Sequence, residues 1–248
     1  VVEPNPSIKS ERGYSAEIGF RQGFKFEQPR SRIMGYLDIA AFRMQYQDMV
    51  EFGVSTADIN VFGESDIRFS SINVADARIS GVELTGLFAG NWGKTFVNFS
   101  GGIMYLDPIN LNAAPPELQI DLESGDADAL NLDTKVDQPE FLKYRQRWTG
   151  RASLSVGHGP VSLTANYRQK SFTQTIDQYL FLVIQDLRDF RQRYPNGNQV
   201  LDLIVNWDVT KEHQISFIAN NVTNEEFTVI PGFLAPQRKF TIQYRWKF

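Results

Sequence analysis

Residues 238–248 read RKFTIQYRWKF, and large apolar side chains occupy every second position from residue 240 onward. These apolar residues are Phe240, Ile242, Tyr244, Trp246 and Phe248. The positions between them are polar or charged, and a period of two is typical of a β-strand with one apolar face. A water-soluble enzyme seldom leaves such a face and a terminal aromatic residue uncovered, so the stretch raises the question of what covers it.

The bulk composition narrows the answer. The sequence has 248 residues, no cysteine, a formal net charge of −4 and a pI of about 5.3. The acidic balance disfavours a nucleic-acid partner, and the lack of cysteine excludes a disulfide framework and a cysteine-based zinc site. The sequence combines 19 phenylalanines with a mean hydropathy of −0.31. A membrane β-barrel reconciles these values, because only alternate residues of its strands face lipid.

No run of about 18 apolar residues predicts a transmembrane helix, and residues 1–10 do not resemble a signal peptide. The period of two recurs along the chain and predicts nine strands in all. They cover residues 14–24, 33–50, 77–89, 95–106, 142–156, 161–168, 200–209, 214–222 and 239–248.

The predicted connections alternate between two lengths. The short ones are residues 25–31, 91–94, 157–160 and 210–213, and the long ones are 51–76, 107–141, 171–199 and 224–238. Short turns at one end and long loops at the other are typical of an outer-membrane barrel. We therefore predict an all-β fold, an antiparallel transmembrane β-barrel. A soluble β-sandwich with one exposed basic face is the alternative.

The odd number of strands carries a further expectation. Single-chain bacterial barrels have an even number of strands, and an open sheet in lipid leaves costly unpaired edges. We therefore expect residues 1–248 to be the C-terminal portion of a larger barrel domain, with the remaining wall encoded upstream.

Three sequence islands resemble TonB-dependent outer-membrane receptors. The first is NPSIKSERGYSAEIGF (residues 5–20), the second is NVADARISGVELTG (73–86), and the third runs from the NVTNEEF segment (221–227) through Gly232 and Pro236-Gln237-Arg238 to the final strand. The resemblance implies a plugged barrel of about 22 strands, of which this chain would supply the last nine. It also implies a plug domain and a TonB-contacting segment upstream.

Basic residues gather on one side of the predicted strand 142–156 and continue on the next strand. They are Lys143, Arg145, Arg147, Arg151 and Arg168. In the barrel model these side chains project into the lumen. They would contact an anionic substrate such as a ferric chelate with carboxylates or catecholates. Alternatively, they form salt bridges with the plug domain or with wall residues such as Asp202, Asp208 and Glu83.

Two long loops carry the other candidates. The segment YLFLVIQDLRDFRQRY (residues 179–194) predicts a short helix or an extended rim, and its Tyr179 and Phe181 would contact ligand or pack against a neighbouring loop. The loop 110–141 is acidic and would form a divalent-cation site, a lid or a solvated surface. Both histidines, His158 and His213, fall in predicted short turns, so we expect no catalytic site, no metal site and no cofactor.

The resemblance thus implies an outer-membrane receptor of a Gram-negative bacterium that imports a scarce nutrient, an iron–siderophore or similar metal chelate, powered through TonB. The expected partners are outer-membrane lipid on the apolar side of the terminal strand, TonB and the plug domain, the barrel-assembly machinery and a surface lipoprotein. A passive porin-like or structural barrel and a soluble β-sandwich binding module are the alternatives.

Overall fold

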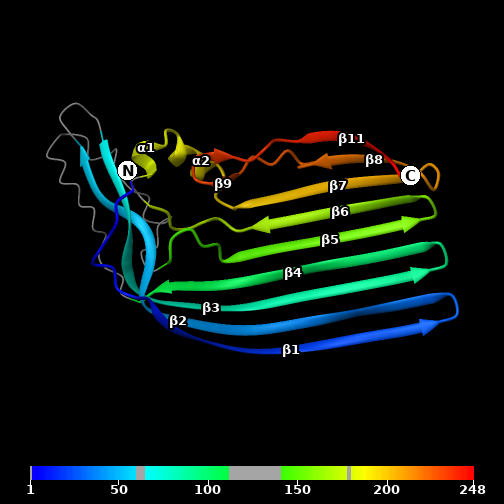
Figure 1. Ribbon diagram of the computed structural model, residues 1–248, viewed down its shortest axis with the longest axis horizontal. Coiled ribbons are helices and arrows are strands. Elements are labelled where there is room, and N and C mark those ends of the chain that lie inside the picture. The colour runs from blue at the N-terminus through cyan, green and yellow to red at the C-terminus, as the bar shows by residue number, and fades with distance from the viewer. Residues whose placement is uncertain (1, 60–64, 112–140, 178–179) are drawn as a thin grey trace.

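The computed structural model describes all residues except 1, 60–64, 112–140 and 178–179. Nine strands form one sheet in the order β1-β2-β3-β4-β5-β6-β7-β8-β11 (Figure 1). The strands are β1 (Arg12–Gln28), β2 (Ser31–Ile59), β3 (Ser65–Trp92), β4 (Thr95–Asn110), β5 (Trp148–His158), β6 (Val161–Lys170), β7 (Asn198–Asp208), β8 (His213–Asn220) and β11 (Lys239–Trp246). Every neighbouring pair is antiparallel. The nine predicted strands are confirmed.

The remaining elements are short and gather at one end of the sheet (Figure 1). Helices α1 (Leu180–Val183) and α2 (Leu187–Arg193) lie between β6 and β7. Strands β9 (Thr228–Ile230) and β10 (Phe233–Leu234) pair with each other between β8 and β11. We call this end of the sheet the long-loop end. In the described part of the chain, no helix is both long and apolar enough to cross a membrane.

The opposite end carries the short turns, at residues 29–30, 93–94, 159–160 and 209–212 (Figure 1). Gly93 and Gly159 occupy two of these turns with φ values of +60° and +56°, a left-handed conformation that glycine adopts without steric cost. The predicted alternation of short and long connections is therefore confirmed at this end.

One predicted long loop is wrong. Residues 51–76 do not form a loop, because β2 and β3 continue to pair as far as Ile59 and Ser65. Register shifts between Tyr46 and Met49, between Met49 and Val50, and between Val54 and Thr56 interrupt the ladder. A bulge adds a residue and breaks the alternation of faces, so the period of two fades although the backbone pairing continues.

The start of the predicted fifth strand is also wrong. β5 begins at Trp148, and residues 142–147 belong to the irregular connection before it. Tyr144 has a φ of +60°, a conformation that a strand does not contain. The alternating sequence extends further than the strand, because tertiary contacts divert the chain at this point.

The two faces of the sheet differ in polarity. Residues that are directly opposite on adjacent strands point to the same side, and the register aligns apolar residues in rows across the sheet. One such row consists of Phe26, Ile33, Val97, Val156, Leu163, Val205, Phe217 and Ile242. We call this side the apolar face. The other side, the polar face, carries Arg21, Asp38, Thr85, Arg151 and Arg168 in one row.

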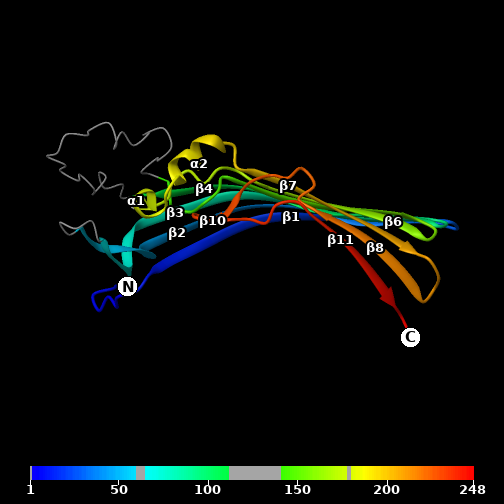
Figure 2. The same ribbon diagram turned by 90° about the horizontal axis from the view of Figure 1, so that it is seen from above.

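The sheet is a single curved layer (Figure 2), and nothing in the described chain covers its apolar face. Ile18 is 78% exposed and Ile242 is 75% exposed. The terminal residues Phe240, Tyr244, Trp246 and Phe248 are exposed as well. The one cluster of buried apolar residues, formed by Met49, Ala77 and Leu142 in the described chain, packs with Tyr46 and Ile79 toward the long-loop end. Burial inside the chain therefore does not stabilise most of the sheet.

Candidate functional site

A groove with a basic lining lies on the polar face of the sheet. It has a volume of about 930 Å³ and is lined by residues of β2 to β6 and of the connection before β5. Its charged lining residues are Arg151, Arg168, Lys170 and Glu83. Three cations thus face one carboxylate in this groove.

Strand pairing places the two arginines of the groove side by side. Arg151 on β5 is directly opposite Arg168 on β6. Like charges directly opposite on adjacent strands repel each other. In the described residues Arg151 has no ion-pair partner, whereas Arg168 forms an ion pair with Asp202, with 3.0 Å between Nη2 and Oδ2. The pair relieves one of the two charges, so the other remains available to an anion.

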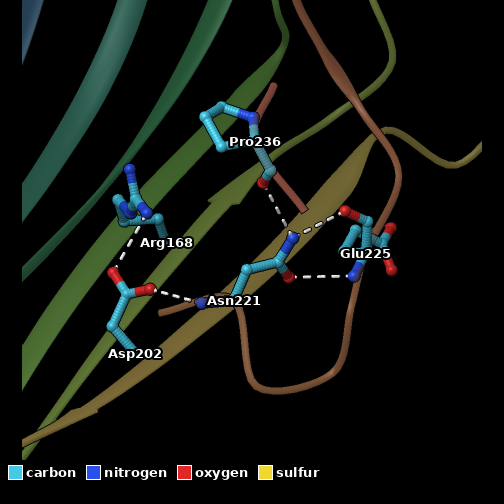
Figure 3. A network of polar contacts seen from close by, with 5 residues as sticks. All are labelled: Arg168, Asp202, Asn221, Glu225 and Pro236. Atoms are coloured by element: carbon cyan, nitrogen blue, oxygen red, sulfur yellow. Dashed lines mark hydrogen bonds and ion pairs between the residues drawn. The ribbon is translucent and has the colours of Figure 1, made fainter. Parts of the chain in front are cut away.

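Asp202 also holds the chain beyond β8. Its Oδ1 accepts a hydrogen bond of 2.7 Å from the backbone N–H of Asn221 (Figure 3). The Asn221 side chain in turn binds Glu225 through both backbone groups, at 2.8 Å each, and donates to the Pro236 carbonyl at 3.4 Å. The sequence singled out Asp202 as a wall partner for the basic residues, and the structure pairs it with Arg168.

Lys143 does not reach the groove. Its ammonium group pairs with Asp177, whose side chain is only 6% exposed. The neighbouring Tyr144 donates its hydroxyl to the other carboxylate oxygen of Asp177 at 2.7 Å. Two consecutive residues of the β4–β5 connection therefore clamp one buried carboxylate of the β6–β7 connection. No alternation or motif in the sequence marks Asp177, so it was not among the predicted site residues.

Arg147 is also engaged within the protein. Its Nη1 lies 3.2 Å from Asp107 Oδ1, and its Nε donates to Gln174 at 3.2 Å. The guanidinium group further stacks over the Phe141 ring at 4.7 Å. These contacts join β4 to the β4–β5 and β6–β7 connections, so Arg147 occupies a structural position between elements.

Arg145 lies close enough to Glu51 to influence its titration. Glu51 sits on β2 beyond Tyr46, outside the apolar band of the sheet, and burial raises its pKa above the ordinary value. The positive charges of Arg145 and Lys143 act in the opposite direction, while Asp177 adds to the increase. The predicted basic row thus divides: Lys143, Arg145 and Arg147 join acidic residues near the long-loop end, and Arg151 and Arg168 line the groove.

A second cavity, of about 320 Å³, lies between α2 and residues 226–231, which include β9. Its walls include Phe172, Phe190, Tyr194 and Phe227, and it shares Gln146 and Lys170 with the groove. The two cavities therefore adjoin. Only the three-dimensional contact of two distant loops creates this cavity, so the sequence pattern did not predict it.

Of the two predicted loop aromatics, Phe181 is described by the structure and Tyr179 is not. Phe181 lies in α1, with the guanidinium groups of Arg188 and Arg191 at 5.8 Å and 5.9 Å from its ring. The helical alternative for this segment is confirmed by α1 and α2. Tyr179 and the acidic loop 112–140 lie outside the described residues. Among the residues that are described, no group of three or more His, Asp or Glu side chains is arranged to hold a metal ion.

The two histidines lie at the short-turn end. His158 Nδ1 is 2.7 Å from the Thr95 hydroxyl, and His213 Nδ1 is 2.6 Å from the Tyr244 hydroxyl. The groove is lined by residues 149–153 of β5 and 166–170 of β6, toward the long-loop ends of these strands. Both histidines lie at the opposite end of the sheet. Neither histidine is therefore placed to act on a molecule held by Arg151 and Arg168.

The comparisons with known proteins agree with this architecture. A family model described as TonB dependent receptor-like, beta-barrel matches residues 1–222. No curated protein matches. Among solved structures, the copper transporter OprC shares 15% identity, with a TM-score of 0.52, over 98% of this chain and 32% of its own. The FrpB iron transporter from Neisseria meningitidis shares 15% identity, with a TM-score of 0.49, over 100% and 33%.

A mutant of the ferric enterobactin receptor PfeA from Pseudomonas aeruginosa shares 13% identity, with a TM-score of 0.47, over 98% of this chain and 32% of its own. The chain thus spans about a third of the length of these structures. The family model covers most of the sheet, and the order and alternating connections of the strands match part of a barrel wall. The chain belongs to the TonB-dependent receptor family, and its nine antiparallel strands form part of that family's β-barrel, which does not close within this chain.

Proposed function

We propose that this chain forms the last nine strands of an outer-membrane receptor that imports an anionic metal chelate, with an iron–siderophore as the favoured class. The basic groove on the polar face carries the proposal: it holds Arg151, Arg168 and Lys170 against Glu83 alone. In a closed barrel the polar face lines the lumen and the apolar face contacts lipid. A basic lumen wall attracts anions and forms strong charge-assisted hydrogen bonds with carboxylates and catecholates.

The proposed substrate contacts include only some of the five basic residues that the sequence predicted. Lys143 and Arg147 already pair with Asp177 and Asp107, so removing them would disturb the loops that surround the groove. Arg151 and Arg168 remain as substrate contacts, and Lys170 joins them because it lines both cavities. Phe181, in the loop above, contributes to the outer rim in this proposal.

The transport mechanism rests on parts that lie outside this chain. We propose an upstream plug domain that fills the lumen and an upstream segment that receives energy from TonB. The barrel-assembly machinery would insert the barrel into the outer membrane, and a surface lipoprotein is a further partner. Family membership supports the plug and TonB.

The test uses the intact receptor in a strain that lacks other receptors for metal chelates. Ferric chelates that carry carboxylates or catecholates are supplied as the sole iron source. We expect uptake by the wild type, loss of uptake when TonB is deleted, and a rise of about tenfold or more in the half-saturating concentration for Arg151→Ala, because one charge-assisted hydrogen bond is lost. Ser155→Ala, on the same face of β5 but outside the groove lining, is the matched control and should leave uptake unchanged.

Each alternative has its own result. Uptake that persists without TonB would support a passive barrel. A lower maximal rate for Arg151→Ala, with an unchanged half-saturating concentration, would assign Arg151 to the plug interface. No growth on any of these chelates would overturn the proposed substrate class.

A further inference from the structure

The groove and the loop between β8 and β11 meet at one carboxylate. Asp202 lies on the polar face of β7, and its side chain is 14% exposed. One of its oxygens binds Arg168, which lines the groove, and the other accepts the backbone N–H of Asn221, which follows directly after β8 (Figure 3). A single side chain therefore connects the lumen wall to the start of this loop.

Asn221 closes the loop that it begins. It is 4% exposed and adopts a left-handed conformation with a φ of +49°, which asparagine tolerates better than most residues. Its side chain binds both backbone groups of Glu225 and the carbonyl of Pro236 (Figure 3). Pro236 lies three residues before β11 begins at Lys239, so one side chain joins the two ends of the loop.

Arg168 is held at one edge and open at the others. Its contact with Asp202 uses one nitrogen, Nη2, whereas a guanidinium group has five N–H donors. The side chain is 57% exposed and lines the groove, so its remaining donors are accessible from there. An anion can therefore bind Arg168 without displacing Asp202.

We propose that Asp202 and Asn221 are positioning residues that hold Arg168 toward the groove, so that closure of the 221–238 loop and the presentation of Arg168 form one linked equilibrium. A carboxylate that has two partners is restricted to one orientation, and the arginine bound to it is restricted as well. The value of this link for substrate binding rests on the proposed function, whereas the link itself is measurable without any substrate.

The first experiment measures amide hydrogen exchange of residues 225–236 in the intact receptor. Linkage makes the coupling reciprocal, so loss of Arg168 should loosen the loop. We expect Arg168→Gln to raise the exchange rate of this segment by about fivefold or more. Arg151→Gln is the matched control, because Arg151 is directly opposite Arg168 and does not contact Asp202. Both arginines are exposed, so neither substitution should prevent folding.

The second experiment runs in the other direction. An arginine-selective dicarbonyl reagent is applied to wild type and Asn221→Ala, and modification is quantified at each arginine by mass spectrometry. We expect the modification rate of Arg168 to rise by a similar factor in Asn221→Ala, while that of Arg151 stays at the wild-type value. Together, these two results would support one linked equilibrium.

Three results would overturn the inference: loop exchange unchanged by Arg168→Gln, an equal rise with Arg151→Gln, or Arg168 modification unchanged by Asn221→Ala. The proposed function fails separately. If Arg151→Ala leaves chelate uptake unchanged while Arg168→Gln loosens the loop, the link stands and the assignment of the groove to an anionic substrate falls.

Discussion

The role of each basic residue depends on its immediate partner. Lys143 and Arg151 have the same parity in the sequence, which predicted one common face for them. Asp177 instead pairs with Lys143 and accepts a hydrogen bond from the hydroxyl of Tyr144. Tyr144, the residue after Lys143, has a left-handed backbone conformation. A buried carboxylate needs such partners, because an uncompensated buried charge is strongly destabilising. Arg151 forms no ion pair with any residue that the structure describes, and it lines the groove.

The partly buried carboxyl of Glu51 gives a pH prediction at this scale. Its pKa is raised mainly by burial, so the folded state binds its proton more tightly than the unfolded state does. Stability therefore falls as the pH rises from the unfolded pKa through the folded pKa. Glu51→Gln does not titrate, so we expect it to stabilise the surrounding loops at neutral pH relative to wild type.

Below about pH 4.5, the ordinary value for this group, wild type and Glu51→Gln should converge. The measurement is the amide protection of residues 143–145 and 175–177 between pH 4 and pH 7, corrected for intrinsic exchange. If wild type is the better protected protein at neutral pH, attraction to Arg145 and Lys143 outweighs burial, and the prediction is wrong.

At the scale of elements, strands and loops are separated by backbone pairing and not by hydrophobic alternation. β2 and β3 remain paired at 26 register positions, from Ser31 opposite Trp92 to Ile59 opposite Ser65. The bulges near Met49 mark where the alternation stops being informative. Strand pairing needs only backbone groups, whereas alternation requires one face to be buried or to lie in lipid.

Close contact between β1, β2 and β3 leads to a prediction about Gly35. This residue is directly opposite Phe24, and a Cβ atom there would lie 2.7 Å from the Phe24 ring and meet the Leu87 carbonyl oxygen. We expect Gly35→Ala to destabilise the barrel by about 1–3 kcal/mol, because overpacking forces neighbouring groups to shift.

Gly23→Ala is the matched control for Gly35→Ala, since the nearest atom to its added Cβ is 3.8 Å away. The measurement is the urea midpoint of the intact receptor in detergent micelles. Equal midpoints for the two variants would show that the strands separate enough to accept a methyl group at residue 35.

At the scale of the whole molecule, the sheet is a single layer whose two faces differ in polarity. Its apolar face has no cover in the described chain, and β1 and β11 form its two edges. In the proposed receptor, lipid would cover one face, a filled lumen would satisfy the other, and further strands of a larger barrel would pair with the edges. The chain therefore depends on its surroundings for most of the stability that a soluble domain draws from a core.

This dependence predicts opposite tolerance of charge on the two faces. Leu154 is exposed on the apolar face, midway between the ends of β5, and Ser153 is its neighbour on the polar face. We expect Leu154→Arg to cost about 2–4 kcal/mol in a bilayer, as a charge near the bilayer midplane does. Ser153→Arg should stay within about 0.5 kcal/mol. Unfolding of the intact receptor from lipid vesicles checks this, and equal costs would contradict a lipid-facing apolar surface.

Several features followed from the sequence because they depend on local repetition. The alternation in RKFTIQYRWKF is reproduced by β11, with Phe240, Ile242, Tyr244 and Trp246 on the apolar face and Phe248 just beyond the strand. The nine strands, the short turns and the apolar face all follow from the period of two, because successive side chains of a strand point to opposite faces of the sheet.

Tertiary structure decided the site. Asp177 binds Lys143 and Tyr144, which lie 34 and 33 residues away in the chain. Asp202 binds Arg168, 34 residues away, and Asn221, 19 residues away. No periodicity encodes such contacts, because they arise only where connections between strands meet. The sequence by itself therefore determined strands with one apolar face and a set of basic residues near β5 and β6. Only the folded arrangement of the loops decided which of those residues are held by acids and which face the groove, because charges pair according to distance in space.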